Sequence, residues 1–169
     1  VYIKSFPTFL SRERESANNN TANTMAPCEV SATCKATPET IWNTVFEPMK
    51  WESWDPDLNE VKDVSTDGCE EGTTCIFAMK DGSNIPITLS NVEKNKSVDF
   101  KGSVAGGIIR AEGKVLITSV DASTSKIDYS FALLGFVGSL VAMIKKKEVV
   151  GGTQGGLDNM VKLSEEAQK

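Results

Sequence analysis

The spacing of apolar and polar residues predicts an order of secondary-structure elements along the chain. Residues 28–35, "CEVSATCK", alternate apolar and polar side chains, which is typical of a half-buried strand. Residues 37–47, "TPETIWNTVFE", place apolar side chains at helical spacing, with a threonine cap and a proline at the first helical position. A proline then ends this helix, and "MKWESW" (49–54) predicts a second short helix before the "DPD" turn.

Six more strand-like runs follow at short spacing. Turn signals such as "DGS" (81–83) and "NKS" (95–97) separate them, so the strands are expected to form an antiparallel meander. Residues 136–168 have helical periodicity at both ends and predict one long helix. The six runs cover about 59–66, 73–80, 84–93, 97–104, 107–119 and 125–134.

This order predicts an α+β helix-grip fold. A curved seven-stranded antiparallel sheet wraps around the long C-terminal helix, and two short helices lie between strands one and two. The last strand can pair with the first. Residues 27–169 are expected to form a single ligand-binding domain, whereas residues 1–26 are polar, low in complexity and expected to be a disordered segment.

Composition removes several classes of function. The chain contains no histidine, which excludes histidine-based acid–base catalysis, Ser–His or Cys–His nucleophiles and imidazole metal sites. A net charge of -5 argues against nucleic acid or an anionic membrane as the main partner. Four cysteines without CxxC spacing are expected to be free thiols, with a Cys69–Cys75 disulfide as the alternative. We expect no metal and no cofactor.

The longest apolar stretch is too short to span a membrane. "FALLGFVGSLVAMI" (131–144) has the length of a buried core element, so we expect no integral membrane segment. The lysine run at 145–147 leaves open a membrane-surface anchor, which the pattern does not favour. We expect a cytoplasmic monomer; an organelle is the alternative if the N-terminal segment is the remnant of a transit peptide.

Residues 30–61 carry a motif pattern that points to a family. The stretch "VSATCKATPETIWNTVFEPMKWESWDPDLNEV" resembles the opening of the polyketide cyclase/dehydrase-like proteins of the START-like (SRPBCC) superfamily, which includes the birch-pollen allergen fold. "GGLDNMVKLSEEAQ" near the end resembles the C-terminal helix of that family. The matching positions are Thr37, Pro38, Glu39, Trp42, Trp51, Trp54, Pro56, Val61, Gly68 and Gly72.

The resemblance implies a hydrophobic tunnel between the sheet and the long helix. "GGTQGG" (151–156) supports this expectation, because four glycines in a helix cost about 3–4 kcal/mol relative to alanine and need an offsetting role. In one interpretation the missing side chains leave space for a ligand above the sheet or form a hinge that controls its entry. In the other, the glycines form a loop that divides the segment into two helices. With the apolar face of each strand turned inward, the expected ligand-binding residues on the strands are Phe77, Met79, Leu89, Phe100, Ile109, Tyr129 and Phe131. Outside the strands, the expected ligand-binding residues are Trp51, Met143, Gly152 and Gly155.

The expected function is binding or transport of a hydrophobic small molecule, such as a lipid, an isoprenoid or a polyketide-like compound. Tyr129 is a polar group that could orient the ligand, and no residue is assigned a catalytic role. The alternatives are a cyclase, aromatase or dehydrase without metal or histidine chemistry, and a protein-interaction module. Trp54 is expected to be structural, whereas Trp51 is expected at either the tunnel rim or the core.

Overall fold

The structure of the protein is a computed structural model that describes residues 26–169. The disordered segment predicted for residues 1–26 therefore lies, except for its last residue, outside the described residues. The same holds for the transit-peptide alternative.

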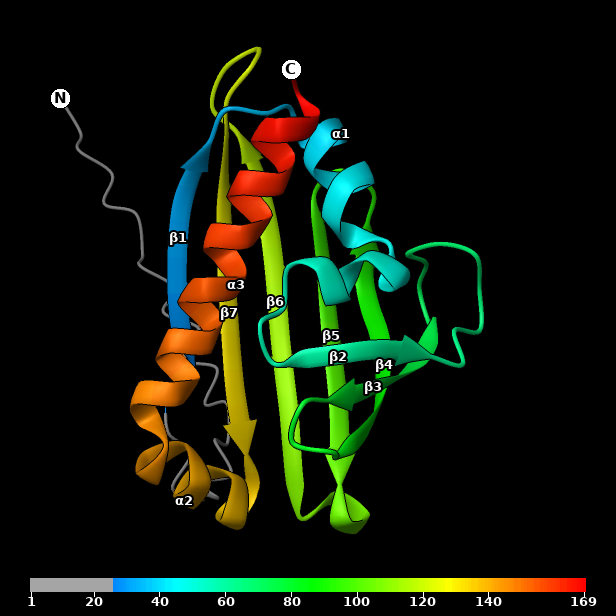
Figure 1. The fold of residues 1–169 in the computed structure, drawn as a ribbon, viewed down its shortest axis with the longest axis vertical. Helices are drawn as coiled ribbons and strands as arrows, with labels where there is room; N and C mark the ends of the chain where they lie inside the picture. The colour runs from blue at the N-terminus through cyan, green and yellow to red at the C-terminus, as the bar shows by residue number, and fades with distance from the viewer. Residues whose placement is uncertain (1–25) are drawn as a thin grey trace, which may run out of the picture.

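Seven strands form one antiparallel sheet in the order β1-β7-β6-β5-β4-β3-β2 (Figure 1). The pairing of the first strand with the last, predicted from the sequence, is confirmed: Cys28 is opposite Phe131 and Cys34 is opposite Ser125. The sheet curves around the C-terminal helix (Figure 1), and the helix-grip fold is confirmed. The strands are β1 (Cys28–Cys34), β2 (Leu58–Lys62), β3 (Thr74–Met79), β4 (Asn84–Glu93), β5 (Ser97–Val104), β6 (Ile109–Ser119) and β7 (Ser125–Leu134).

Three short helical pieces lie between β1 and β2. They are α1 (Pro38–Ile41), the π-helical turn η1 (Trp42–Phe46) and the 3₁₀ helix η2 (Pro48–Ser53). The predicted cap is present, since the Thr37 hydroxyl accepts a hydrogen bond from the Thr40 backbone N–H at 3.2 Å. A further short 3₁₀ turn, η3 (Ala105–Gly107), connects β5 to β6.

The C-terminal segment forms two helices rather than the single helix predicted. α2 (Gly135–Ile144) packs against the end of β7 and the start of β6, whereas α3 (Lys146–Ala167) runs along β1 and β7. The chain changes direction between them at Lys145, which has φ -98° and ψ 23° (Figure 1). The loop interpretation of residues 151–156 is wrong, because these glycines lie inside the continuous helix α3.

Gly135 allows α2 to begin directly after β7. Its φ of 86° lies in the left-handed region, and a Cβ atom there would lie 2.8 Å from the carbonyl oxygen of Ile108. A glycine is therefore required on both conformational and steric grounds.

The densest part of the core lies where α1, η1, η2 and the C-terminal half of α3 cover the sheet. The rings of Trp42 and Phe46 stack with their centroids 4.6 Å apart, and four positions of the sheet point into the same cluster. These positions are fully buried: Leu89, Val98, Val115 and Ile127. The other half of the inner sheet face lies beneath α2 and the N-terminal part of α3, and the candidate site is there.

All four cysteines are free thiols, so the predicted thiol state is confirmed and the alternative Cys69–Cys75 disulfide is wrong. Burial raises the pKa of the Cys34 and Cys75 thiols to about 11 and that of Cys69 to about 12. These three side chains are therefore protonated, poorly nucleophilic thiols at neutral pH.

Candidate functional site: a hydrophobic cavity

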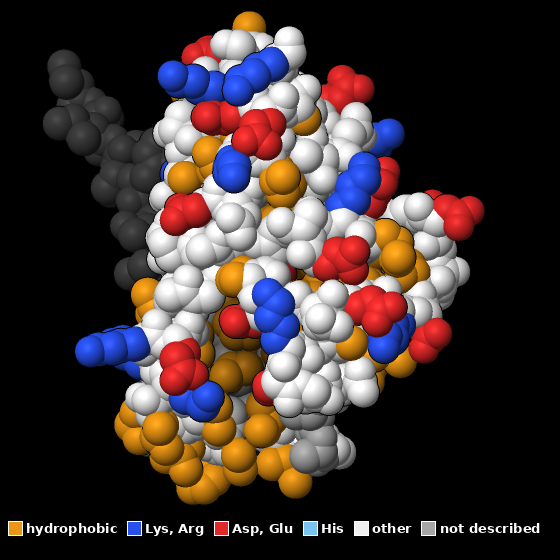
Figure 2. Space-filling view, viewed as in Figure 1, with side chains coloured by type: hydrophobic (Ala, Val, Ile, Leu, Met, Phe, Trp, Pro, Cys, Tyr) orange, Lys and Arg blue, Asp and Glu red, His pale blue; other side chains and the backbone are white. Residues whose placement is uncertain are grey.

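A cavity of about 580 Å³ lies between the inner face of the sheet and the helices α2 and α3. Strands β3 to β7 form its floor, and Figure 2 shows the opening as a hollow with hydrophobic side chains inside it. Its apolar lining consists of Phe77, Met79, Ile85, Ile87, Phe100, Ala111, Phe131, Leu133, Val141 and Val149, and its polar lining of Asp55, Asp57, Lys80, Asp81, Ser83, Tyr129, Lys145, Glu148 and Thr153.

Five of the residues predicted from strand alternation lie together on this cavity. They come from β3, β5 and β7, and each occupies the inward position of its strand. These residues are Phe77, Met79, Phe100, Tyr129 and Phe131.

Four other predicted residues lie elsewhere. Trp51 and Leu89 are only 1% exposed and belong to the closed core. Ile109 lies beneath α2, where its Cγ2 atom is 3.7 Å from the position that a Cβ of Gly138 would take. Met143 is 62% exposed, because α2 presents Val141 rather than Met143 to the cavity.

Gly152 and Gly155 of α3, the two glycines predicted to bind the ligand, face a loop instead of the cavity. A Cβ atom on Gly152 would lie 2.6 Å from the Oδ2 atom of Asp57, and one on Gly155 would lie 3.6 Å from Cγ of Pro56. Their small size therefore lets α3 approach the segment 54–57. Between them, Thr153 does reach the cavity.

An aromatic wall closes the cavity on the side of the dense core. We use this name for Trp51, Trp54, Phe77, Phe100 and Tyr129. The ring centroid of Trp51 lies 5.3 Å from that of Phe77 and 5.1 Å from that of Phe100, and Trp54 lies 6.1 Å from Tyr129. Of the two positions predicted for Trp51, the core position is correct.

Hydrogen bonds fix both tryptophans of the wall. The indole N–H of Trp51 donates to the Phe46 carbonyl at 3.0 Å, and that of Trp54 donates to the Val45 carbonyl at 2.9 Å. Asn159 of α3 in turn donates to the Trp54 carbonyl at 3.0 Å. The "WESW" pattern is thus a structural signature that supports the site without lining it.

Two polar groups lie at the wall, the hydroxyl of Tyr129, which belongs to it, and the carboxyl group of Asp55. Burial, and secondarily the carboxylate of Asp55, raises the pKa of the Tyr129 hydroxyl, which stays protonated. Burial also raises the pKa of Asp55, although its Oδ1 atom accepts a hydrogen bond from the Asp57 backbone N–H at 2.9 Å. Among residues 26–169, none forms a hydrogen bond with the Tyr129 hydroxyl.

Charged side chains surround the mouth of the cavity (Figure 2). The Lys80 ammonium donates to the Pro56 carbonyl at 2.6 Å, and Lys145 forms an ion pair with Glu148 at 2.8 Å. Sequence reasoning missed these residues. It interpreted "DPD" and "DGS" as turns, and nothing in the local pattern indicates that both turns and the start of α3 meet at one opening.

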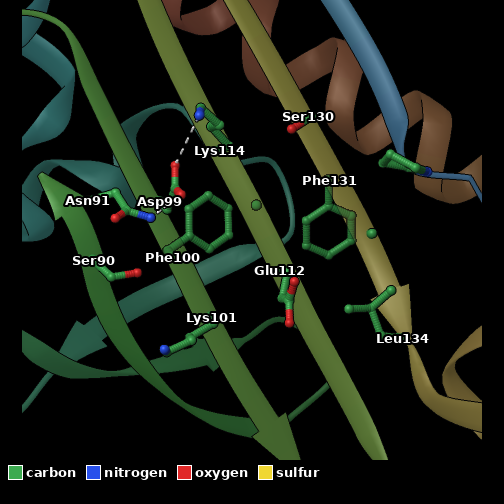
Figure 3. Close-up of a pocket in the computed structure, with 13 residues that line it drawn as sticks. Ser90, Asn91, Asp99, Phe100, Lys101, Glu112, Lys114, Ser130, Phe131 and Leu134 are labelled. Atoms are coloured by element: carbon green, nitrogen blue, oxygen red, sulfur yellow. Dashed lines mark hydrogen bonds and ion pairs between the residues drawn. The ribbon is translucent and has the colours of Figure 1, made fainter. Parts of the chain in front are cut away.

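A second hollow, of about 500 Å³, lies on the outer face of the sheet (Figure 3). Three of its polar side chains interact: Asn91 donates to Asp99 at 2.7 Å, and Lys114 lies 3.9 Å from Asp99. Figure 3 shows the rings of Phe100 and Phe131 on either side of β6. A Cβ atom on Gly113, the residue between them, would lie 2.0 Å from Cζ of Phe100, so the glycine leaves room for this ring. The inner cavity is therefore the better candidate for an apolar ligand.

Within residues 26–169, no group of three or more cysteine, aspartate or glutamate side chains is placed to hold a metal ion. None of the helices that the structure describes is long and apolar enough to cross a membrane.

Residues 25–165 match the model of a family described as polyketide cyclase / dehydrase and lipid transport. The chain belongs to this family. The match covers every strand of the helix-grip fold and nearly all of α3, including the whole cavity. The family description spans both catalysis and lipid binding, so membership supports a ligand-binding or cyclase role without choosing between them.

Solved structures share the fold at low sequence identity. A hypothetical protein from Helicobacter pylori superposes with a TM-score of 0.72 at 14% identity, covering 96% of this chain and 99% of that one. The di-domain aromatase/cyclase BexL of the BE-7585A biosynthetic pathway gives a TM-score of 0.64 at 16% identity, covering 83% of this chain and 47% of BexL. The XoxI protein from Bacillus cereus gives 0.62 at 16% identity, covering 82% and 94%. A comparison with curated proteins finds no significant match.

Proposed function

We propose that this protein binds and carries a hydrophobic small molecule in the cavity between the sheet and helices α2 and α3. The observation that carries the proposal is the cavity itself, about 580 Å³ in volume and lined by apolar side chains from five strands and two helices. Pockets of this size and composition are typical of small-molecule sites. Burial of the apolar part of the ligand supplies affinity at about 25 cal/mol per Å².

The polar end of the cavity limits the chemistry of the ligand. A hydroxyl or enol group can donate to the Asp55 carboxylate and accept from the Tyr129 hydroxyl. A carboxylate placed there is repelled by Asp55 and Asp57. We therefore propose a largely apolar ligand with a neutral hydrogen-bonding group, such as an isoprenoid alcohol, a sterol-like compound or a polyketide-like phenol.

Native mass spectrometry of the purified protein tests the proposal. We expect a mass excess under native conditions that disappears from the denaturing spectrum of the same sample. The released compound should displace a fluorescent apolar probe from the protein. A native spectrum of the bare chain, together with no binding of the probe, contradicts the proposal.

The cyclase or dehydrase alternative is favoured by one observation, the proximity of Asp55 to Tyr129 beside an apolar cavity. A carboxyl group whose pKa is raised by burial is suited to exchange protons with a substrate, and a tyrosine can stabilise a developing oxyanion. Such an enzyme closes a poly-β-keto chain by aldol addition and loss of water.

Turnover assays with a poly-β-keto substrate separate the two functions. The enzyme alternative predicts that Asp55→Asn and Tyr129→Phe abolish turnover and leave probe binding intact, with Asp67→Asn in the β2–β3 loop as the control. The carrier proposal predicts that the wild-type protein binds the substrate or the probe without turnover.

A further inference from the structure

Large hydrophobic side chains gather at the end of the molecule formed by α2, below the opening of the cavity (Figure 2). Phe136 is 86% exposed, Ile144 is 74% exposed and Met143 is 62% exposed, although a soluble helix normally buries such residues. Together with Leu140 and Ile108 they form what we call the α2 patch. Ile108 belongs to it because its carbonyl lies directly against the start of α2.

A contiguous group of five large apolar side chains differs from isolated exposed residues. Val120 and Met49 are also exposed, at 61% and 57%, but they stand singly in other parts of the molecule. Single exposed hydrophobic residues are normal on protein surfaces, whereas contiguous patches indicate an interaction site.

Basic residues border the α2 patch. Residues 135–144 contain no charged side chain, and the exposed Lys146 and Lys147 follow directly at the start of α3. Neither lysine forms an ion pair with any residue between 26 and 169, unlike Lys145, which pairs with Glu148. Arg110 is exposed at the same end of the sheet, opposite Leu134. The combination of exposed apolar side chains and neighbouring unpaired cations is typical of surfaces that lie in a membrane interface.

We propose that the α2 patch docks onto the surface of a lipid membrane that carries anionic headgroups. The apolar side chains enter the boundary between headgroups and acyl chains, and Lys146 and Lys147 contact the lipid phosphates. The net charge of -5 opposes long-range attraction to such a membrane, so binding depends on this local surface.

A second copy of the chain fits the α2 patch less well. In a two-fold symmetric pair the same surface is used twice, which brings the basic borders of two patches close together. An anionic bilayer neutralises those charges instead.

The position of the patch links it to the cavity, although the docking surface does not depend on the function proposed above. Val141 of α2 lines the cavity. Lys145, which directly follows α2, lines it as well. Docking of α2 therefore places the mouth of the cavity beside the bilayer, where an apolar ligand can pass without crossing water.

Vesicle flotation of the full chain tests this inference, with phosphatidylcholine vesicles prepared with and without phosphatidylglycerol. We expect binding that requires the anionic lipid. Phe136→Ser should lower the partition coefficient by roughly tenfold or more. Lys147→Glu should lower it by roughly fivefold or more, because a cation is lost and an anion is gained at the surface.

The matched controls lie at the opposite end of the molecule. Val120→Ser removes an apolar side chain that is 61% exposed, close to the 62% of Met143, from the β6–β7 turn. Lys94→Glu reverses a charge in the β4–β5 turn, and both variants should bind vesicles like the wild type. Met143→Ser provides a second patch variant if Phe136→Ser does not fold. Probe binding in the absence of vesicles should be unchanged in every variant, which separates this test from that of the proposed function.

Three results overturn the inference. The wild type could fail to bind vesicles, or the patch variants could bind as well as their controls. The third is a dimer in sedimentation velocity that Phe136→Ser converts to monomer, which assigns the α2 patch to a second copy of the chain.

Discussion

The two halves of the inner sheet face carry the same alternating pattern but are covered in opposite ways. On β7, Ile127 is fully buried beneath the dense core, whereas Leu133, six residues further and on the same face, lines the cavity. On β5, Val98 is fully buried while Phe100 stands at the boundary. Alternation along a strand thus determines which side chains face inward, but the elements above the sheet determine whether the space is filled.

The cover of each half explains the difference. In the closed half, Trp51 of η2 and Trp54 directly after it insert into the core, and their indole N–H groups donate to backbone carbonyls so that the rings remain fixed. In the open half, α2 lies across the end of the sheet and directs several of its large side chains to solvent. These side chains do not fill the space between α2 and the sheet, which therefore remains as the cavity.

The largest effect is expected from breaking the aromatic wall. Trp51→Ala removes a fully buried ring that contacts Phe77 and Phe100, and it should lower the free energy of unfolding by about 3–5 kcal/mol. Urea denaturation followed by circular dichroism measures this change. Met49→Ala, at an exposed position of the same short helix, should change stability by less than about 0.5 kcal/mol. Equal effects of the two changes contradict the assignment of Trp51 to the wall.

A pair of truncations on β7 compares the two halves directly. Ile127→Ala creates a hole in a packed region and should cost about 2–5 kcal/mol of unfolding free energy. Leu133→Ala enlarges space that is already empty, so it should cost about half as much or less. Urea denaturation of both variants gives the ratio. A larger cost for Leu133→Ala means that this half is as tightly packed as the other.

A smaller, pH-dependent effect is expected at Asp55, where burial raises the folded-state pKa above that of the unfolded chain. The stability that protonated Asp55 contributes is present below about pH 4 and is lost as the pH rises through the raised folded-state pKa. Asp57, Lys80 and Tyr129 are the ionisable neighbours on this side of the cavity.

Asp55→Asn keeps an oxygen for the Asp57 backbone N–H and carries no charge. The variant should therefore be more stable than the wild type at neutral pH and similar to it below about pH 4. Urea unfolding across this range measures the difference. Asp67→Asn, at an exposed position, should retain the wild-type pH dependence; a stability difference for Asp55→Asn that does not change with pH contradicts the role of burial.

The fold was accessible from sequence because it depends on local signals. The Thr37 cap, the alternation in β1 and the short turns between strands each act over a few residues, and together they predict the order of elements. The helix break at Lys145 could not be predicted, because no glycine or proline marks it and the direction of α2 depends on its contacts with β6 and β7.

The site was only partly predictable for the same reason. The alternation of side chains along the strands correctly predicts that Phe77, Phe100 and Phe131 face the cavity. It cannot distinguish them from Leu89, which also faces inward but lies in the closed core. The sequence predicts that Gly152 and Gly155 line the cavity, because glycine lowers the stability of a helix and a ligand site would explain its presence. The role that the structure gives them, close approach to Pro56 and Asp57, depends on tertiary contacts that the sequence does not reveal.

The most direct test of the account is a probe titration of two matched variants on neighbouring strands. Ala111→Phe adds a ring on the cavity face of β6, and Ala132→Phe adds the same ring on the outer face of β7, one rung away. We predict that Ala111→Phe abolishes binding of a fluorescent apolar probe, whereas Ala132→Phe binds it with wild-type affinity. Unchanged binding in Ala111→Phe, or equal loss in both variants, would contradict the claim that the open half of the sheet holds the ligand.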